Sequence, residues 1–140
     1  MKKHNRRNNV ARKITLKGIK KKADLVFSQY IRRLHSDTSG RCICVTCGDI
    51  KPYQDMQNGH YFPRNRLGTR FHEDNCHPQC PACNVFRNGN YTAYAAYMYK
   101  KYGTQKMEQM EALSRKMIKL TISDYQSMIE GWRTMMEKMK

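Results

Sequence analysis

The sequence predicts an α+β fold in which a small zinc-bound core lies between helices. Two Cys-x2-Cys pairs, Cys44/Cys47 and Cys80/Cys83, bracket a region rich in His, Gly and Pro. Apolar residues recur at helical spacing on both sides of that region. The chain has 140 residues, the length of one domain, and can bury only a modest core. A structural metal would therefore add needed stability.

Residues 1–14 predict a basic flexible arm, because they are polar and asparagine-rich and show no apolar periodicity. Residues 15–36 predict one amphipathic basic helix. Its apolar positions recur at helical spacing and are Ile19, Ala23, Val26, Phe27, Tyr30, Ile31 and Leu34. Lysines and arginines fill its other faces. The turn-forming run from Ser36 to Gly40 ends this helix.

Residues 37–103 are expected to form the zinc-bound core. Strands are predicted near residues 41–45 and 56–62, and a short helix is predicted over 81–87, where Pro81 occupies a tolerated first-turn position. Asn88 and Gly89 would end that helix. The core is therefore expected to be built from short elements ordered by metal.

Residues 104–140 are expected to form C-terminal helices. Gly103 would end a preceding helix over residues 90–102, and a further helix is predicted over 104–117. Thr121 and Asp124 have the spacing of a capping box and predict the start of a last helix. The methionines of this region are expected to be packing residues.

Zinc is the metal that the paired cysteines predict, since a Cys-x2-Cys turn lets two thiolates converge on one ion. The expected ligands are Cys44, Cys47, Cys80 and Cys83. Four sulfurs complete a tetrahedral site and leave no position for water, so this single Zn2+ is expected to be structural. Cys42 and Cys76 are expected to be packed thiols.

The chain is strongly basic, with 27 lysines and arginines against 11 acidic residues and a formal net charge of +16 at pH 7. A partner with dense negative charge is expected, and nucleic acid is favoured because these side chains neutralise phosphates. A merely solubilising tail is the alternative. No apolar run approaches the roughly 20 residues of a membrane span, and no signal peptide is evident, so we expect a cytoplasmic protein without a membrane partner.

A histidine and two asparagines lie between or beside the cysteine pairs. His60 ends a predicted strand, Asn75 lies in the connection that follows, and Asn84 comes directly after the last cysteine. Alone, a histidine beside two aromatic residues is usually structural, and asparagines are common in turns and caps. Whether these three residues form a functional site must therefore be judged from the sequence around them.

Several longer strings make the chain resemble a known family. They are Cys44-Val45-Thr46-Cys47-Gly48, Gly59-His60-Tyr61, Arg70-Phe71-His72-Glu73-Asp74-Asn75-Cys76-His77-Pro78-Gln79-Cys80, Cys83-Asn84, Gly89-Asn90 and Tyr94. On these residues the chain resembles the NinG (Rap) family of phage recombination endonucleases and, more distantly, endonuclease VII-type junction resolvases. The resemblance covers residues 23–135 and is densest over 41–103.

The resemblance implies a zinc-stapled ββα-metal core (HNH, treble-clef-like) flanked by N- and C-terminal helices. It also implies a metal-dependent, structure-selective DNA endonuclease that cuts branched recombination intermediates, such as Holliday junctions and D-loops, in the host-cell cytoplasm. In an HNH site one histidine takes a proton from water while one Mg2+, or Mn2+, polarises the phosphate. The implied roles are His60 as base, Asn84 as metal ligand, and Asn75 as the residue that holds the loop and orients His60.

One position departs from the HNH pattern. Many of these nucleases carry Asp or His before the catalytic histidine, whereas this chain has Gly59, which offers only its carbonyl to a cation that prefers oxygen. Glu73 or Asp74 would then supply the carboxylate. We favour Glu73, where the NinG pattern also has Glu, and His77 is a second candidate ligand or base.

DNA contacts are expected from basic residues near the site and on the first helix: Arg64, Arg66, Arg70, Arg87, Lys20, Lys21 and Lys22. Most would contact phosphates, so that selectivity for branched double-stranded DNA would come from its shape. The two-fold symmetry of a junction makes a homodimer through the C-terminal helices a hypothesis. The alternative function is a non-catalytic zinc module that binds DNA or RNA, including a structural protein of the ribosomal kind.

Overall fold

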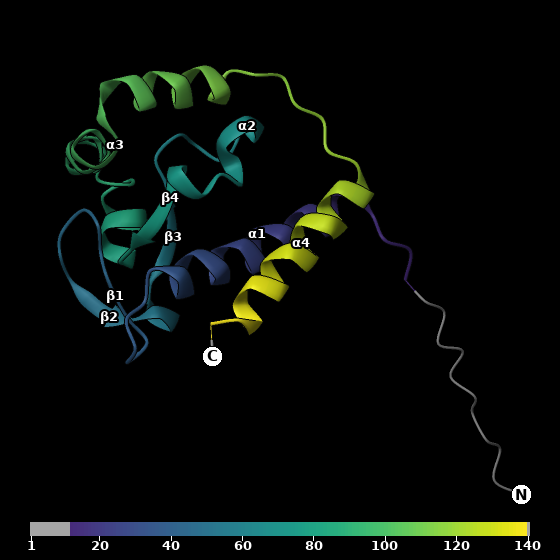
Figure 1. The fold of residues 1–140 in the computed structure, drawn as a ribbon, viewed down its shortest axis with the longest axis horizontal. Helices are drawn as coiled ribbons and strands as arrows, with labels where there is room; N and C mark the ends of the chain where they lie inside the picture. The colour runs from purple at the N-terminus through teal and green to yellow at the C-terminus, as the bar shows by residue number, and fades with distance from the viewer. Residues whose placement is uncertain (1–11, 140) are drawn as a thin grey trace, which may run out of the picture.

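The computed structural model describes residues 12–139, so most of the predicted basic arm over residues 1–14 lies outside the described residues. The described part is α+β, with helices around two small antiparallel sheets (Figure 1). In chain order the elements are α1 (Leu16–Leu34), β1 (Arg41–Ile43), β2 (Ile50–Pro52), η1 (Tyr53–Asp55), β3 (Gln57–His60), α2 (Leu67–Arg70), η2 (Glu73–Asn75), β4 (Cys76–Gln79), η3 (Ala82–Phe86), α3 (Tyr91–Ser114) and α4 (Ile122–Glu137).

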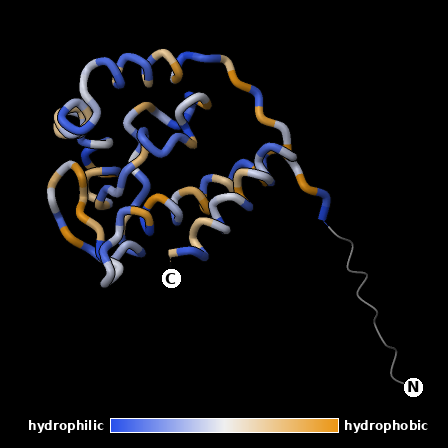
Figure 2. The backbone as a smooth tube through the Cα atoms, in the orientation of Figure 1, coloured by the Kyte–Doolittle hydropathy of each residue, from blue (hydrophilic) through white to orange (hydrophobic). Residues whose placement is uncertain are grey.

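The first and last helices pack against each other (Figure 1). Thr15 caps α1 by accepting a hydrogen bond from the Gly18 amide, and α4 begins with the predicted capping box of Thr121 and Asp124. Figure 2 shows apolar residues alternating with polar ones along both helices. The shared core contains Phe27 and Trp132, whose ring centroids are 4.8 Å apart. The predicted helix over 15–36 is therefore confirmed, slightly shortened.

The two sheets are hairpins. β1 pairs with β2 around the turn that carries the first cysteine pair, and β3 pairs with β4 so that Gly59 lies opposite His77. β1 and β3 lie within the predicted strands, whereas β2, β4 and α2 were not predicted. All four residues of β4 are buried, so it shows no alternation, and β2 and α2 are only three and four residues long.

The long helix α3 is two helices joined at a bend. Gly103 has φ 78° and ψ 165°, a conformation outside the helix and on the left-handed side that glycine tolerates. The predicted break at Gly103 is confirmed. Both halves contribute to one cluster that buries Tyr94, Met98, Met107 and Met110, so these methionines pack as predicted. The prediction is wrong for Met117, which is fully exposed in the segment between α3 and α4, and for Met135, which is 45% exposed. Within residues 12–139, no helix combines the length and apolar composition needed to cross a bilayer.

Candidate functional site

The four paired cysteines come together as predicted. The Sγ atoms of Cys44, Cys47, Cys80 and Cys83 all lie within 4.8 Å of one another, and those of Cys47 and Cys80 are 3.6 Å apart. Sulfurs bound to one tetrahedral zinc at ~2.3 Å would be ~3.8 Å apart. The cluster could therefore hold one zinc ion and would join the β1–β2 turn to the start of η3.

The surroundings of Cys83 favour the thiolate that zinc requires. Burial raises the pKa of this thiol, but hydrogen bonds from Thr46, Asn90 and Arg87 outweigh burial and lower the pKa to about 6. The Arg87 guanidinium donates to the sulfur at 3.3 Å and the Asn90 amide at 3.6 Å. These donors form an outer shell around the cluster.

The two remaining cysteines lie outside the cluster. Cys42 and Cys76 are fully buried, and the Cys42 thiol donates to the Arg32 carbonyl at 3.0 Å. Burial raises the pKa of both thiols. Their assignment as packed thiols is confirmed.

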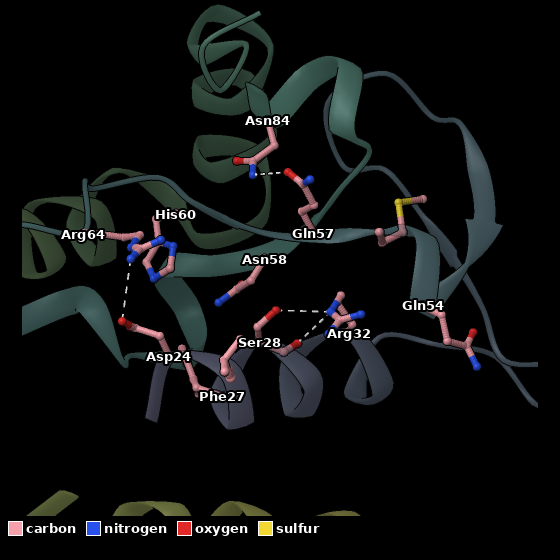
Figure 3. A pocket seen from close by; sticks show the side chains of 12 residues that line it. Asp24, Phe27, Ser28, Arg32, Gln54, Gln57, Asn58, His60, Arg64 and Asn84 are labelled. Atoms are coloured by element: carbon pink, nitrogen blue, oxygen red, sulfur yellow. Dashed lines mark hydrogen bonds and ion pairs between the residues drawn. The ribbon is translucent and has the colours of Figure 1, made fainter. Parts of the chain in front are cut away.

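His60 and Asn84 line one cleft of about 420 Å3 between α1 and the β3–β4 hairpin (Figure 3). β3 ends at His60, and η3 places Asn84 next to Cys83 of the cysteine cluster. The two residues are far apart in sequence, so the cysteine cluster that anchors η3 also positions Asn84. Two of the residues predicted from sequence therefore meet in the structure.

The hydrogen bond of His60 defines its neutral tautomer. Its Nε2 lies 2.8 Å from the Arg70 carbonyl oxygen, and a carbonyl can only accept, so Nε2 carries the hydrogen. Nδ1 then holds the lone pair. Burial lowers the pKa of His60 below its ordinary 6.5, and the Arg64 charge adds to this, while the Arg70 carbonyl opposes it. At neutral pH the ring is therefore an unprotonated base.

The amide of Asn84 is oriented by Gln57. Its nitrogen donates to the Gln57 side-chain oxygen at 2.7 Å. Because the nitrogen is used in this contact, the amide oxygen is the atom left for a ligand. Figure 3 shows this oxygen on the side of the amide toward His60.

The Asn75 side chain joins two parts of the loop after β3 through hydrogen bonds. Its side-chain oxygen accepts from the Phe62 amide at 2.7 Å, and its nitrogen donates to the Phe62 and Thr69 carbonyls, each at 3.0 Å. The side chain is fully buried. Asn75 thus holds the loop that contains Arg70, whose carbonyl contacts His60.

Position 59 has no room for a side chain. A Cβ atom on Gly59 would lie 2.0 Å from the side-chain oxygen of Gln79. The Gly59 carbonyl also accepts a hydrogen bond from the Tyr94 hydroxyl at 2.7 Å. In this structure the Gln79 side chain therefore fills the space that an Asp or His side chain would need at position 59.

The other predicted ligands lie outside the cleft. Glu73 is exposed and accepts a hydrogen bond from Tyr30, and Asp74 forms an ion pair with Lys106 at 2.9 Å. His77 is fully buried, with its two ring nitrogens 2.9 and 2.8 Å from the hydroxyls of Tyr94 and Tyr102. Burial lowers the pKa of His77 to about 3.

Asp24 is the residue that sequence reasoning missed. Among the residues that line the cleft it alone carries a carboxylate. Its oxygens accept from Nε of Arg70 at 2.9 Å and from Nη2 of the same guanidinium, and Arg64 lies 3.6 Å away. Asp24 is also the one acidic residue of the otherwise basic helix α1, which was the available sequence signal.

The expected DNA-contacting residues fall into two groups. Arg64, Arg87, Lys21 and Lys22 are exposed, whereas Lys20 and Arg66 are partly buried and Arg66 donates to Ser114 at 3.0 Å. Arg70 is the exception, because its guanidinium is buried and each of its three nitrogens donates to Asp24 or to the Arg64 carbonyl. The expectation that Arg70 contacts phosphates is at odds with this placement.

Comparison with known proteins gives one match. The whole chain, residues 1–140, matches the family model described as Bacteriophage Lambda NinG protein. No curated protein and no solved structure matches it.

Proposed function

The chain belongs to the family of the bacteriophage lambda NinG protein, and from this premise we propose that it is an HNH-type endonuclease that cuts branched DNA in phage recombination. One observation carries the proposal: His60 and Asn84 line the same cleft although they come from different elements. If the core is of the ββα-metal type, β3 and β4 are its two strands and η3 is its helix. The cysteine cluster would then hold η3 against the β3–β4 hairpin.

His60 is the proposed general base. Its neutral ring donates through Nε2 to the Arg70 carbonyl, and among residues 12–139 its Nδ1 has no hydrogen-bond partner, so that it can take a proton. In the proposed step a water oxygen bonds to phosphorus, the bond from phosphorus to the 3′ oxygen breaks, and the water proton passes to Nδ1. The lowered pKa of His60 keeps the ring unprotonated at neutral pH. His77 is less suited to this role, because tyrosine hydroxyls contact both of its ring nitrogens.

The lining of the cleft suits a hard cation such as Mg2+ or Mn2+. It offers the Asn84 amide oxygen and the Asp24 carboxylate, and the buried Asn58 side-chain oxygen has no hydrogen-bond donor among the described residues. Bound there, Mg2+ would polarise the scissile phosphate and stabilise the leaving 3′ oxygen. Asp24, rather than Glu73, is the carboxylate that supports this part of the proposal.

Branched double-stranded DNA is the proposed substrate. Exposed arginines and lysines on α1, on the loop after β3 and beside η3 would contact its phosphates. A homodimer matched to a two-fold junction is part of the proposal, although Ile129 and Met136 of α4 already pack against α1 within one chain. An interface would have to use the exposed face of that helix.

The test compares wild type with His60→Ala on four-way and flapped DNA in Mg2+, measuring binding and cutting separately. We expect cutting to fall by about 10²- to 10⁴-fold, the range of general-base catalysis, with binding retained. His72→Ala is the matched control, since His72 does not line the cleft and should cut like wild type.

Equal cutting by His60→Ala and wild type would show that the base lies elsewhere. A zinc-loaded wild type that binds branched DNA but cuts none of it, with Mg2+ or Mn2+, would favour the alternative of a non-catalytic zinc module.

A further inference from the structure

Two apolar side chains directly after Asn84 face solvent. Phe86 is 82% exposed and Val85 is 53% exposed, both on the turn η3. Single exposed apolar side chains are common on protein surfaces, so the significance of these two depends on what lies beside them. Both side chains directly follow Asn84, which lines the cleft.

The turn that carries Phe86 is held rigidly. The backbone N–H of Asn84 donates to the Cys80 carbonyl, and the backbone N–H of Gly89 donates to the Cys83 carbonyl, each at 2.9 Å. The two ends of the turn are therefore hydrogen-bonded to cysteines of the proposed zinc site. The Arg87 amide donates to the Ala82 carbonyl, five residues back, as in the π-helical turns often found at functional sites. A side chain presented on a rigid turn loses little conformational entropy when a ligand covers it.

Exposed basic and apolar side chains lie both beside Phe86 on its turn and in the cleft that Asn84 lines. Arg87 follows it and is exposed, and Arg64 lines the cleft with its side chain 62% exposed. Leu25, on α1, lines the same cleft and is 65% exposed. An exposed apolar and an exposed basic side chain therefore line the cleft, and the turn that follows Asn84 carries another exposed pair, Phe86 and Arg87.

We propose that Phe86, supported by Val85, is a stacking site for an unpaired nucleobase at the branch point of the DNA. A base has an aromatic face that stacks on phenylalanine, and its phosphates match the arginines nearby. Branched DNA presents unstacked bases where its strands diverge, and intact duplex does not. A second copy of this chain fits less well, because each copy carries a formal net charge of +16. The inference rests on the proposed function and adds how the substrate class is recognised.

The test uses full-length, zinc-loaded protein and flapped DNA with 2-aminopurine at the branch point, in Ca2+ so that binding is measured without cutting. Wild type should change the 2-aminopurine fluorescence on binding. Phe86→Ala should abolish that change and weaken binding of flapped DNA by about 5- to 150-fold, the range for loss of one stacked base. Phe86→Trp should restore both, and duplex binding should stay within about two-fold, since phosphate contacts carry it.

Ile50→Ala is the matched control, because Ile50 is 59% exposed but lies on β2, outside the cleft. Normal binding and fluorescence in Phe86→Ala would overturn the inference while leaving the proposed nuclease intact. A Phe86-dependent dimer in sedimentation, without a fluorescence change, would also overturn it and assign the side chain to self-association. A wild type inert toward all branched DNA would overturn the proposed function as well.

Discussion

At the residue scale, the orientation of His60 depends on a chain of contacts that begins on another element. The Arg70 carbonyl holds Nε2 of His60, and the Arg70 side chain is held by Asp24 of α1 and by the Arg64 carbonyl. Asn75 closes the same loop through Phe62 and Thr69. Besides its proposed place at the cation site, Asp24 is therefore also a positioning residue for the proposed base, acting through Arg70.

Asp24→Asn should impair the proposed cleavage and change its pH dependence. The amide cannot form the paired ion contact with Arg70, and displacement of a catalytic group by about 1 Å can cost on the order of 10²-fold in rate. The Asp24 charge also raises the pKa of His60, against the larger effect of burial. Without that charge the pKa falls further. Since the neutral ring is the active form, the acidic limb of the rate profile should move to lower pH.

The measurement is the rate of cutting of four-way DNA across the acidic range, for wild type and Asp24→Asn. In wild type the limb should have its midpoint below 6.5, the ordinary pKa of histidine. Glu130→Gln removes one negative charge from the exposed face of α4 and is the control. A variant with the wild-type rate and limb would show that Asp24 does not act on His60.

Sequence reasoning identified the site residues that stand in recognisable short motifs. It did not identify the residues whose role depends on contacts between distant parts of the chain. His60, Asn75 and Asn84 stand in short strings with recognisable neighbours. The partnership of Asp24 with Arg70 spans 46 residues and has no local pattern. The steric reason for Gly59 likewise depends on Gln79, which only the pairing of β3 with β4 brings near.

At the element scale, the cysteine cluster replaces the hydrophobic core that these short strands cannot provide. β1 and β2 have three residues each and β3 and β4 have four, and isolated hairpins of this size are marginally stable. The paired cysteines made the cluster predictable. The strands beside the cluster were only partly predictable, because they are short and β4 is buried along its whole length, without periodic apolar residues.

Loss of the metal should therefore disorder η3 and lower the stability of the whole core. Cys80→Ser should remove zinc and destabilise the fold severely, because metal binding to such sites contributes on the order of 10 kcal/mol. Metal analysis should give one zinc per chain in wild type and little in the variant, with a lower melting temperature. Cys42→Ser is the control, since Cys42 is buried but outside the cluster and should keep its zinc. Loss of zinc in Cys42→Ser would mean that the ligand set is misassigned.

At the scale of the whole molecule, the cleft lies between two parts of the chain with different sources of stability. α1 and α4 form one apolar cluster that extends to Phe71 and Cys76, and the cysteine cluster has its own small core with Cys42 and Met56. Asp24 comes from α1, whereas Asn84 comes from η3, beside the cysteine cluster. The helices were predictable from periodicity, but their mutual packing, and hence the cleft, was not.

The distribution of charge predicts how DNA binding responds to salt. Residues 2–13 carry six lysines and arginines, and each phosphate neutralised contributes about 0.9 to the slope of log affinity against log salt concentration. Deleting these residues should reduce the magnitude of that slope by as much as about 5 and weaken binding, while the proposed cutting site is retained. Fluorescence anisotropy with four-way DNA over a range of KCl concentrations measures both quantities.

Neutralising Lys116 and Lys119, in the segment between α3 and α4, is the control and should change the slope little. An unchanged slope in the deletion would assign phosphate binding to the rest of the chain, through exposed residues such as Arg64, Arg87 and Lys21.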